Sequence, residues 1–128
     1  MKLRIHDNSI RLRLTRSEVS RFASAGAIES AVEFGPAVDQ RMRYGLESSL
    51  DVSGLEVRFV DQRLRILLPA AMAKEWTAGD QVGVDGQQSL SAGRQLDILV
   101  EKEFRRLHGA KFDPDLYPNP LEAIPAHS

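Results

Sequence analysis

The chain of 128 residues has no cysteine, a single tryptophan, two tyrosines and almost no net charge. Without cysteine there is neither a disulfide framework nor a thiolate metal site. No apolar run approaches the roughly 20 residues that a membrane-spanning helix needs. Charged residues also interrupt the apolar ones near the N-terminus, so we expect no signal peptide there. These absences predict a cytoplasmic protein without a membrane partner.

The overall composition is balanced between basic and acidic residues. Hydrophobic residues make up 42% of the chain and charged residues 27%, with 17 Lys and Arg against 18 Asp and Glu. These values are typical of a soluble globular protein, and the length suits one domain with its own core. Nucleic-acid-binding domains are usually basic overall, so the balance argues against nucleic acid as a partner. We find no internal repeat or linker, and therefore expect residues 1–128 to form a single domain.

The chain begins with a predicted β-hairpin. Apolar and polar residues alternate on both sides of Asp7-Asn8, which is typical of strands that are buried on one face. Asx residues tolerate positive φ and suit a two-residue turn, which would place Leu3 opposite Leu12 and Arg4 opposite Arg11. Like charges directly opposite each other destabilise a sheet. Acidic neighbours, open solvent or an anionic ligand must therefore offset them.

Capping signals predict a short helix after this hairpin, over residues 16–24. Thr15 and Glu18 form a capping box, and Gly26 is a natural C-terminal stop. Alternating segments predict further strands over residues 27–34, 41–47, 82–87 and 96–102. Because short connections join most neighbours, we expect mainly antiparallel pairing.

A second hairpin, centred on Asp61-Gln62, repeats the pattern of the first. Its predicted register places Arg58 opposite Arg65, with apolar side chains on the other face. A second short helix follows, in which we expect Met72 and Trp76 to share the buried face. The two hairpins thus predict two pairs of facing Arg side chains.

The segment over residues 108–128 is rich in proline, which is incompatible with a regular helix or a sheet interior. Its apolar residues, including Phe112 and Tyr117, predict an extended strap that lies on the body. Together the elements predict an α+β fold with two short helices and this C-terminal strap. Its sheet would be curled and mostly antiparallel, of about seven or eight strands, or an open barrel.

Several short motifs occur in order along the chain: Asn8–Thr15, Glu33–Gly35, Asp80–Gly83, Leu99–Phe104 and Tyr117–Pro120. As a set they resemble those of a family of small bacterial proteins with no characterised function. The resemblance covers nearly the whole chain and implies a single intact domain, but no activity, cofactor or substrate. In that family we expect a cysteine two residues after the position of Phe104, where this chain has Arg106, so no thiol role is implied.

Basic residues occupy outward positions on the predicted strands: Lys2, Arg4, Arg11, Arg13, Arg41, Arg43, Arg58, Arg63 and Arg65. Arg presents a fork of N–H donors that suits phosphate, so these residues are candidates for an anion site. The same face would be an ordinary solvated surface if the basic side chains pair with acidic ones across the strands. The acidic candidates for such pairs are Glu29, Glu33, Glu47, Glu56, Glu101 and Glu103. The near-equal acid count favours this ion-paired interpretation.

Two other groups are candidates for metal chemistry. Glu101 and Glu103 alternate on the last strand and could hold a hard cation. Proteins that process triphosphates in an antiparallel tunnel carry such alternating Glu residues in their first strand, where this chain has none. The tail could supply oxygen and nitrogen ligands to a metal ion from His108, Asp113, Asp115 and His127. The segment Asp113-Pro114-Asp115 is also typical of an ordinary turn. We expect no metal site, no cofactor and no nameable catalytic residue.

The sequence therefore favours a non-enzymatic binding or interaction protein that works through its Arg-rich strand face. The candidate ligand-binding residues are Arg4, Arg11, Arg13, Arg58, Arg65, Glu101 and Glu103. The alternative is a small enzyme, or the relic of one, that acts on a phosphorylated or other anionic ligand at that face. The candidate partners are an anionic small molecule or another protein, including a second copy of the chain.

Overall fold

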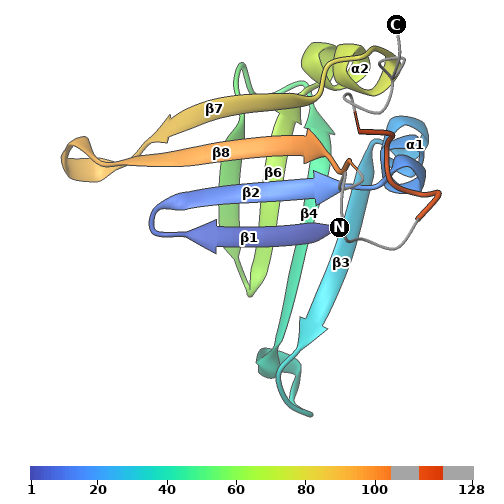
Figure 1. Cartoon of the computed structure of the whole chain (residues 1–128). Helices are drawn as coiled ribbons and strands as arrows, with labels where there is room; N and C mark the ends of the chain where they lie inside the picture. Colours follow the sequence, from blue (N-terminus) through green and yellow to red (C-terminus); the bar gives the residue numbers. More distant parts are fainter. Residues whose placement is uncertain (105–112, 120–128) are drawn as a thin grey trace, which may run out of the picture.

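The computed structural model describes residues 1–104 and 113–119 of the chain. Its strands are β1 (Lys2–His6), β2 (Ser9–Leu14), β3 (Ala27–Glu33), β4 (Arg41–Ser49), β5 (Glu56–Val60), β6 (Arg63–Pro69), β7 (Gly83–Ser89) and β8 (Gln95–Lys102). Its α-helices are α1 (Arg16–Ala25) and α2 (Ala70–Ala78), and short 3-10 turns occur at Val38–Gln40 and Ser91–Gly93. Sheet A has the strand order β1-β2-β8-β7, and sheet B has the order β3-β4-β6-β5. Figure 1 shows the strands of sheet A crossing in front of those of sheet B.

The α+β class is confirmed, but the expected single curled sheet or open barrel is wrong. The described residues form two sheets, and each is mixed, because its two antiparallel hairpins meet at a central parallel pair, β2-β8 or β4-β6. The cause is the helices: α1 takes the chain from sheet A into sheet B, and α2 takes it back. Alternation along a strand predicts which face is buried, but it does not reveal the neighbouring strand.

Residues 2–102 form two equivalent units, each a hairpin, a helix and a second hairpin. The first hairpin of each unit pairs with the second hairpin of the other, which builds the two sheets with the same strand arrangement. The registers of the two parallel pairs also correspond. The β2-β8 pair starts with Ser9 opposite Asp97, and the β4-β6 pair starts with Arg63 opposite Arg43. The expectation of no internal repeat is therefore wrong at the level of structure. The units share apolar positions and turn positions more than residue identities.

The first hairpin and first helix form as predicted. Leu3 lies opposite Leu12 in the β1-β2 register. The capping box is present at the start of α1, where the Thr15 N–H donates to the Glu18 carboxylate at 2.9 Å. Gly26 ends the helix with a φ of 80°, a left-handed conformation that glycine adopts at little cost. Local sequence signals suffice for this part of the fold.

The second hairpin also has its predicted register, with Arg58 opposite Arg65. Asp61 and Gln62 take φ values of 52° and 58° in the turn. Gln has no special preference for this region, so the pairing of the flanking strands must hold it there. The apolar alternation thus outweighs a poor turn residue.

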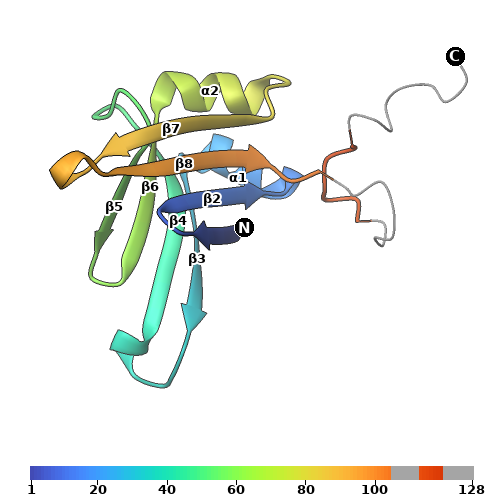
Figure 2. The same ribbon diagram turned by 60° about the vertical axis from the view of Figure 1, so that its left-hand side comes forward.

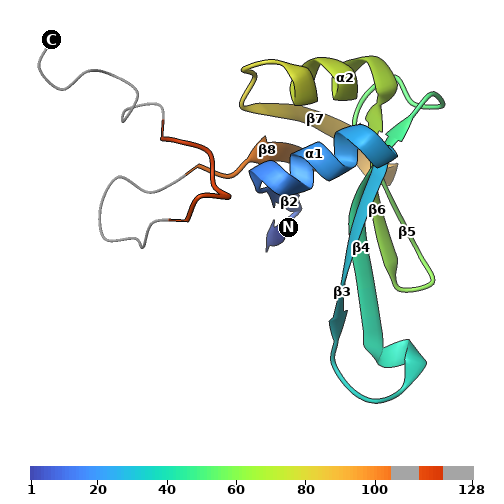
Figure 3. The same ribbon diagram turned by 90° about the vertical axis from the view of Figure 1, so that its right-hand side faces the viewer.

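The core lies between the two sheets, and the helix pair closes one end of it, as Figure 3 shows. Phe22 of α1 and Trp76 of α2 are fully buried, and their rings meet edge to face with centroids 6.3 Å apart. Each ring stands at the corresponding place in its own unit. Ala73 accompanies Trp76 on the buried face of α2, whereas Met72 is 40% exposed, so the prediction for Met72 is wrong.

The described part of the tail lies beyond the end of β8 (Figure 2) and contacts the body there. The Tyr117 ring packs 5.7 Å from the ring of Phe104. The Asp115 carboxylate accepts hydrogen bonds from the Ser17 N–H at 2.8 Å and from its hydroxyl at 2.7 Å, at the start of α1. Residues 113–119 thus lie against the end of β8 and the start of α1. The rest of the strap, Phe112 included, lies outside the described residues.

Candidate functional site on the outward faces of the two sheets

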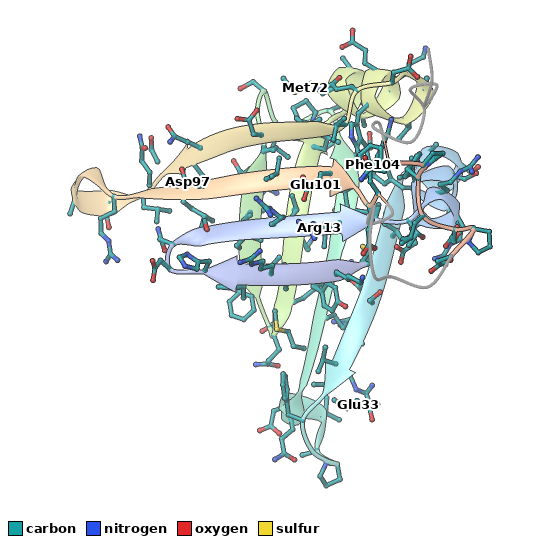
Figure 4. All side chains as sticks on the ribbon, viewed as in Figure 1. Arg13, Glu33, Met72, Asp97, Glu101 and Phe104 are labelled. Carbon is teal, nitrogen blue, oxygen red and sulfur yellow. The ribbon has the colours of Figure 1, made fainter. Side chains whose placement is uncertain are left out.

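The basic residues predicted to share one surface lie on two. We call the outward side chains of sheet A the A face, and those of sheet B the B face. The A face brings together five of the candidate site residues: Arg4, Arg11, Arg13, Glu101 and Glu103. Figure 4 shows Arg13 and Glu101 on the neighbouring strands β2 and β8. Arg58 and Arg65 lie on the B face, so the predicted set is divided between the two sheets.

On the B face, carboxylates are interleaved with the Arg side chains. The Glu47 carboxylate accepts two hydrogen bonds from Arg65, at 3.0 and 2.7 Å, and one from Arg63 at 3.3 Å. Glu29 lies 2.7 Å from Arg63 and 3.8 Å from Arg43. The paired hydrogen bond from Arg65 lowers the pKa of Glu47 below its usual value. The remaining ion pairs of this face are Arg41–Glu33 and Arg58–Glu56.

On the A face, the two signs of charge are segregated. The basic side chains lie on β1 and β2. The acidic side chains lie on β7, on β8 and directly after β8. Arg13 and Arg11 share one carboxylate, because Glu101 lies 2.7 Å from the Arg13 Nε and 3.5 Å from the Arg11 Nε. Arg4, directly opposite Arg11, has no carboxylate partner within the described residues. The like-charge pair of Arg4 and Arg11 therefore lacks an acid of its own.

Two acidic residues on the far side of the A face also lack a basic partner among the residues that the structure describes. The Asp85 carboxylate makes no hydrogen bond or ion pair within residues 1–104 and 113–119. The Asp97 carboxylate accepts one hydrogen bond, from the neutral Gln87 side chain at 2.9 Å. The A face thus carries unpaired positive charge at one edge and unpaired negative charge at the other.

The difference between the faces arises at two positions that correspond in register. Where the B face has Arg63 beside Arg43, the A face has Ser9 beside Asp97. On the B face, these two guanidinium groups pair with the carboxylate of Glu29 on the edge strand β3. The A face therefore lacks the cations that would neutralise Asp85 on its own edge strand, β7.

The A face is also hollowed. A depression of about 270 Å³ is lined by Arg4, His6, Ser9 and Arg11. A second depression, of about 540 Å³, is lined by residues of β2, β7 and β8, among them Ser9, Arg11, Asp85, Asp97 and Leu99. Because both are bordered by Ser9 and Arg11, the two depressions adjoin. They lead from the unpaired cation to the unpaired carboxylates, across all four strands.

The predicted pair of alternating carboxylates does not form an open cation site. Glu101 contacts Arg13, and Glu103 is largely buried with its carboxylate against Lys2. No group of acidic, His or Cys residues within the described chain has the arrangement to hold a metal ion. Of the tail candidates, Asp115 is engaged by α1. His108 and His127 lie outside the described residues.

Sequence reasoning missed Asp85 and Asp97. Both occupy outward positions on strands that were predicted nearly correctly. Their relation to Arg4 and Arg11 depends on the parallel pairing of β2 with β8, which no local pattern encodes. An alignment of the second hairpin with the first could have shown the repeat, because Arg, Asp and the following apolar alternation recur around the two turns.

The chain belongs to a family of unknown function, DUF7009, which it matches over residues 1–121. This confirms the resemblance to an uncharacterised family. No curated protein matches the chain, and no solved structure does. Among residues 1–104 and 113–119, neither helix has the length and apolar character needed to cross a membrane.

Proposed function

We propose that this protein is a non-enzymatic binding protein whose working surface is the A face. The ligand carries an anionic group that Arg4 and Arg11 receive together. One contrast carries the proposal: the facing pair Arg4 and Arg11 has no acid of its own, whereas each member of the corresponding pair, Arg58 and Arg65, contacts a separate carboxylate. The fold can pair such side chains, so Arg4, which has no carboxylate partner among the described residues, is available to a ligand. Arg11 is available in part, because it shares the Glu101 carboxylate with Arg13.

The proposed anion site has suitable donors. Facing side chains on paired strands have Cβ atoms about 5 Å apart, close enough for two guanidinium groups to contact one phosphate or carboxylate. His6 and Ser9 border the same depression, and the Ser9 hydroxyl already donates to the His6 carbonyl. Hydrogen bonds to charged groups contribute about 1.5–3 kcal/mol each when shielded from water, and less at an exposed site. These energies predict that the ligand binds with modest affinity.

Nucleic acid is disfavoured as the ligand. A polyanion lying across the four strands would meet Asp85 and Asp97 after passing Arg4 and Arg11. The alternative function, an enzyme or its relic acting on a phosphorylated ligand, has less support, because the carboxylates of Glu101 and Glu103 are already engaged. A cytoplasmic location remains part of the proposal, and cell fractionation would test it.

Thermal unfolding in rising phosphate, pyrophosphate and a short oligonucleotide, at constant ionic strength, tests the proposal. A ligand that binds only the folded state raises stability by mass action, by about 2.7 kcal/mol at a hundred times its Kd. We expect saturable stabilisation by pyrophosphate, its loss in an Arg4→Gln, Arg11→Gln variant, and no effect of the oligonucleotide. The matched control is Arg58→Gln, which removes the corresponding side chain of the B face and should leave the response unchanged. A flat response of the unaltered protein to both phosphates would refute the anion site.

A further inference from the structure

We propose that the ligand of the A face is dipolar. Besides the anionic group bound at Arg4 and Arg11, it carries an ammonium or guanidinium group that Asp85 and Asp97 receive. This inference rests on the proposed anion site and extends it across the sheet. It gives a role to the acidic half of the A face, to which the anion site alone assigns none.

Unpaired charge of opposite sign lies at the two edges of the A face. Arg4 lacks a carboxylate partner within the described residues, and the Asp85 carboxylate lacks any partner there. Within the same described residues, the Asp97 carboxylate is contacted only by the neutral amide of Gln87. A purely anionic ligand would satisfy the basic half and leave the acidic half to repel it. A ligand with both charges satisfies both halves.

The surface between these charges is a continuous hollow. Ser9 and Arg11 border both depressions, so the hollow continues from the basic half to the acidic half. Leu99, which stands opposite Arg11 on β8, lines the wider depression and gives it an apolar floor. β2 and β7 lie two strand spacings apart, about 10 Å. The ligand should therefore carry its charges at about that separation, joined by an extended and partly apolar chain.

The B face supplies an internal example of the proposed contact. There, Arg63 donates to the Glu29 carboxylate on edge strand β3 at 2.7 Å. The corresponding edge strand of the A face is β7, which carries Asp85, and the position of Arg63 is occupied by Ser9. The shorter side chain leaves space where a guanidinium lies on the B face. The cationic group of the ligand would take this place.

Probes of graded length test the inference in the full chain. We would titrate gamma-aminobutyrate, epsilon-aminocaproate and omega-aminocaprylate at constant ionic strength, following backbone amide resonances of the A face by NMR. The controls are caproate alone, hexylamine alone and an equimolar mixture of the two. We expect affinity to rise with chain length up to the spacing of the two subsites. The best dipolar probe should bind about tenfold more tightly than caproate, the gain expected from one additional charge-assisted contact.

Variants separate this inference from the anion site on which it depends. An Asp85→Asn, Asp97→Asn variant should lose the roughly tenfold preference for the dipolar probe while it keeps its response to pyrophosphate. Glu33→Gln, at an exposed ion pair of the B face, is the matched control and should keep both responses. If pyrophosphate binds but the dipolar probes show no advantage over caproate, the dipolar inference is overturned and the anion site stands. If neither pyrophosphate nor any probe binds, both are overturned.

Discussion

The A face and the B face occupy corresponding positions on two sheets with the same strand arrangement, yet their charged side chains are arranged differently. On the B face, Glu29 and Glu47 lie between Arg side chains, and every Arg of the face has a carboxylate within 4 Å. On the A face, cations gather on β1 and β2 and carboxylates on the other two strands. The strand framework therefore does not dictate the charge pattern. Among the described residues, the segregated pattern occurs on the A face and not on the B face.

Energetics show why such a difference is tolerated. Exposed ion pairs contribute at most about 1 kcal/mol each, so the A face loses little stability by leaving Arg4 and Asp85 unpaired. The core beneath both faces supplies most of the stability, because burial of apolar side chains is the dominant favourable term in folding. A surface that folding does not require to be neutral is free to carry a binding site.

The largest effect should come from the core that the two units share. Phe22→Ala and Trp76→Ala each remove a fully buried ring from the helix interface, and each should lower the free energy of unfolding by about 3–5 kcal/mol. Urea unfolding would measure both. Comparable losses would support the equivalence of the two units. A loss below about 1 kcal/mol for either ring would contradict the shared core.

An intermediate effect should distinguish the corresponding carboxylates Glu47 and Glu101. Glu47→Gln breaks three hydrogen bonds to two Arg side chains and should cost about 1–3 kcal/mol. Glu101→Gln breaks one short bond, to Arg13, and should cost less. It should also strengthen pyrophosphate binding, because it removes the acid that competes for Arg11 and Arg13. Equal costs in urea unfolding would contradict the contrast between the faces.

Acid pH provides the control for the Glu47 prediction. The hydrogen bond from Arg65 holds the pKa of Glu47 in the folded protein below its unfolded value. The stabilisation is therefore fully present above the unfolded pKa, about 4.3, and it is lost as the pH falls through the folded pKa. The stability gap between the unaltered protein and Glu47→Gln should be constant near neutral pH and shrink in acid. A gap that persists in strong acid would show that the substitution acts through packing.

Local patterns predicted the two hairpin registers, the capping box of α1 and the strand positions, because each depends on neighbours in sequence. The strand order could not be predicted, because the β2-β8 and β4-β6 pairs join segments far apart in the chain. The candidate site shows the same limit. Arg4, Arg11 and Arg13 could be grouped from one hairpin, whereas their relation to Asp85 and Asp97 requires the parallel pairing. The assumption of one common Arg face failed for this reason.

The smallest effect should be a difference in stability between substitutions of the corresponding edge residues Arg4 and Arg58. Arg4→Gln removes one of two facing cations without an acid of its own, so it should leave stability unchanged or raise it by up to about 0.5 kcal/mol. Arg58→Gln removes an exposed hydrogen bond of 2.7 Å to Glu56 and should lower stability by up to about 0.5 kcal/mol. Salt screens exposed charges, so the difference between the two variants should diminish as ionic strength rises toward 1 M, where the Debye length is about 3 Å. Urea unfolding of both variants at low and high salt would measure it. A loss above about 1 kcal/mol for Arg4→Gln would mean that folding itself uses this side chain, and the A face would no longer be free for a ligand.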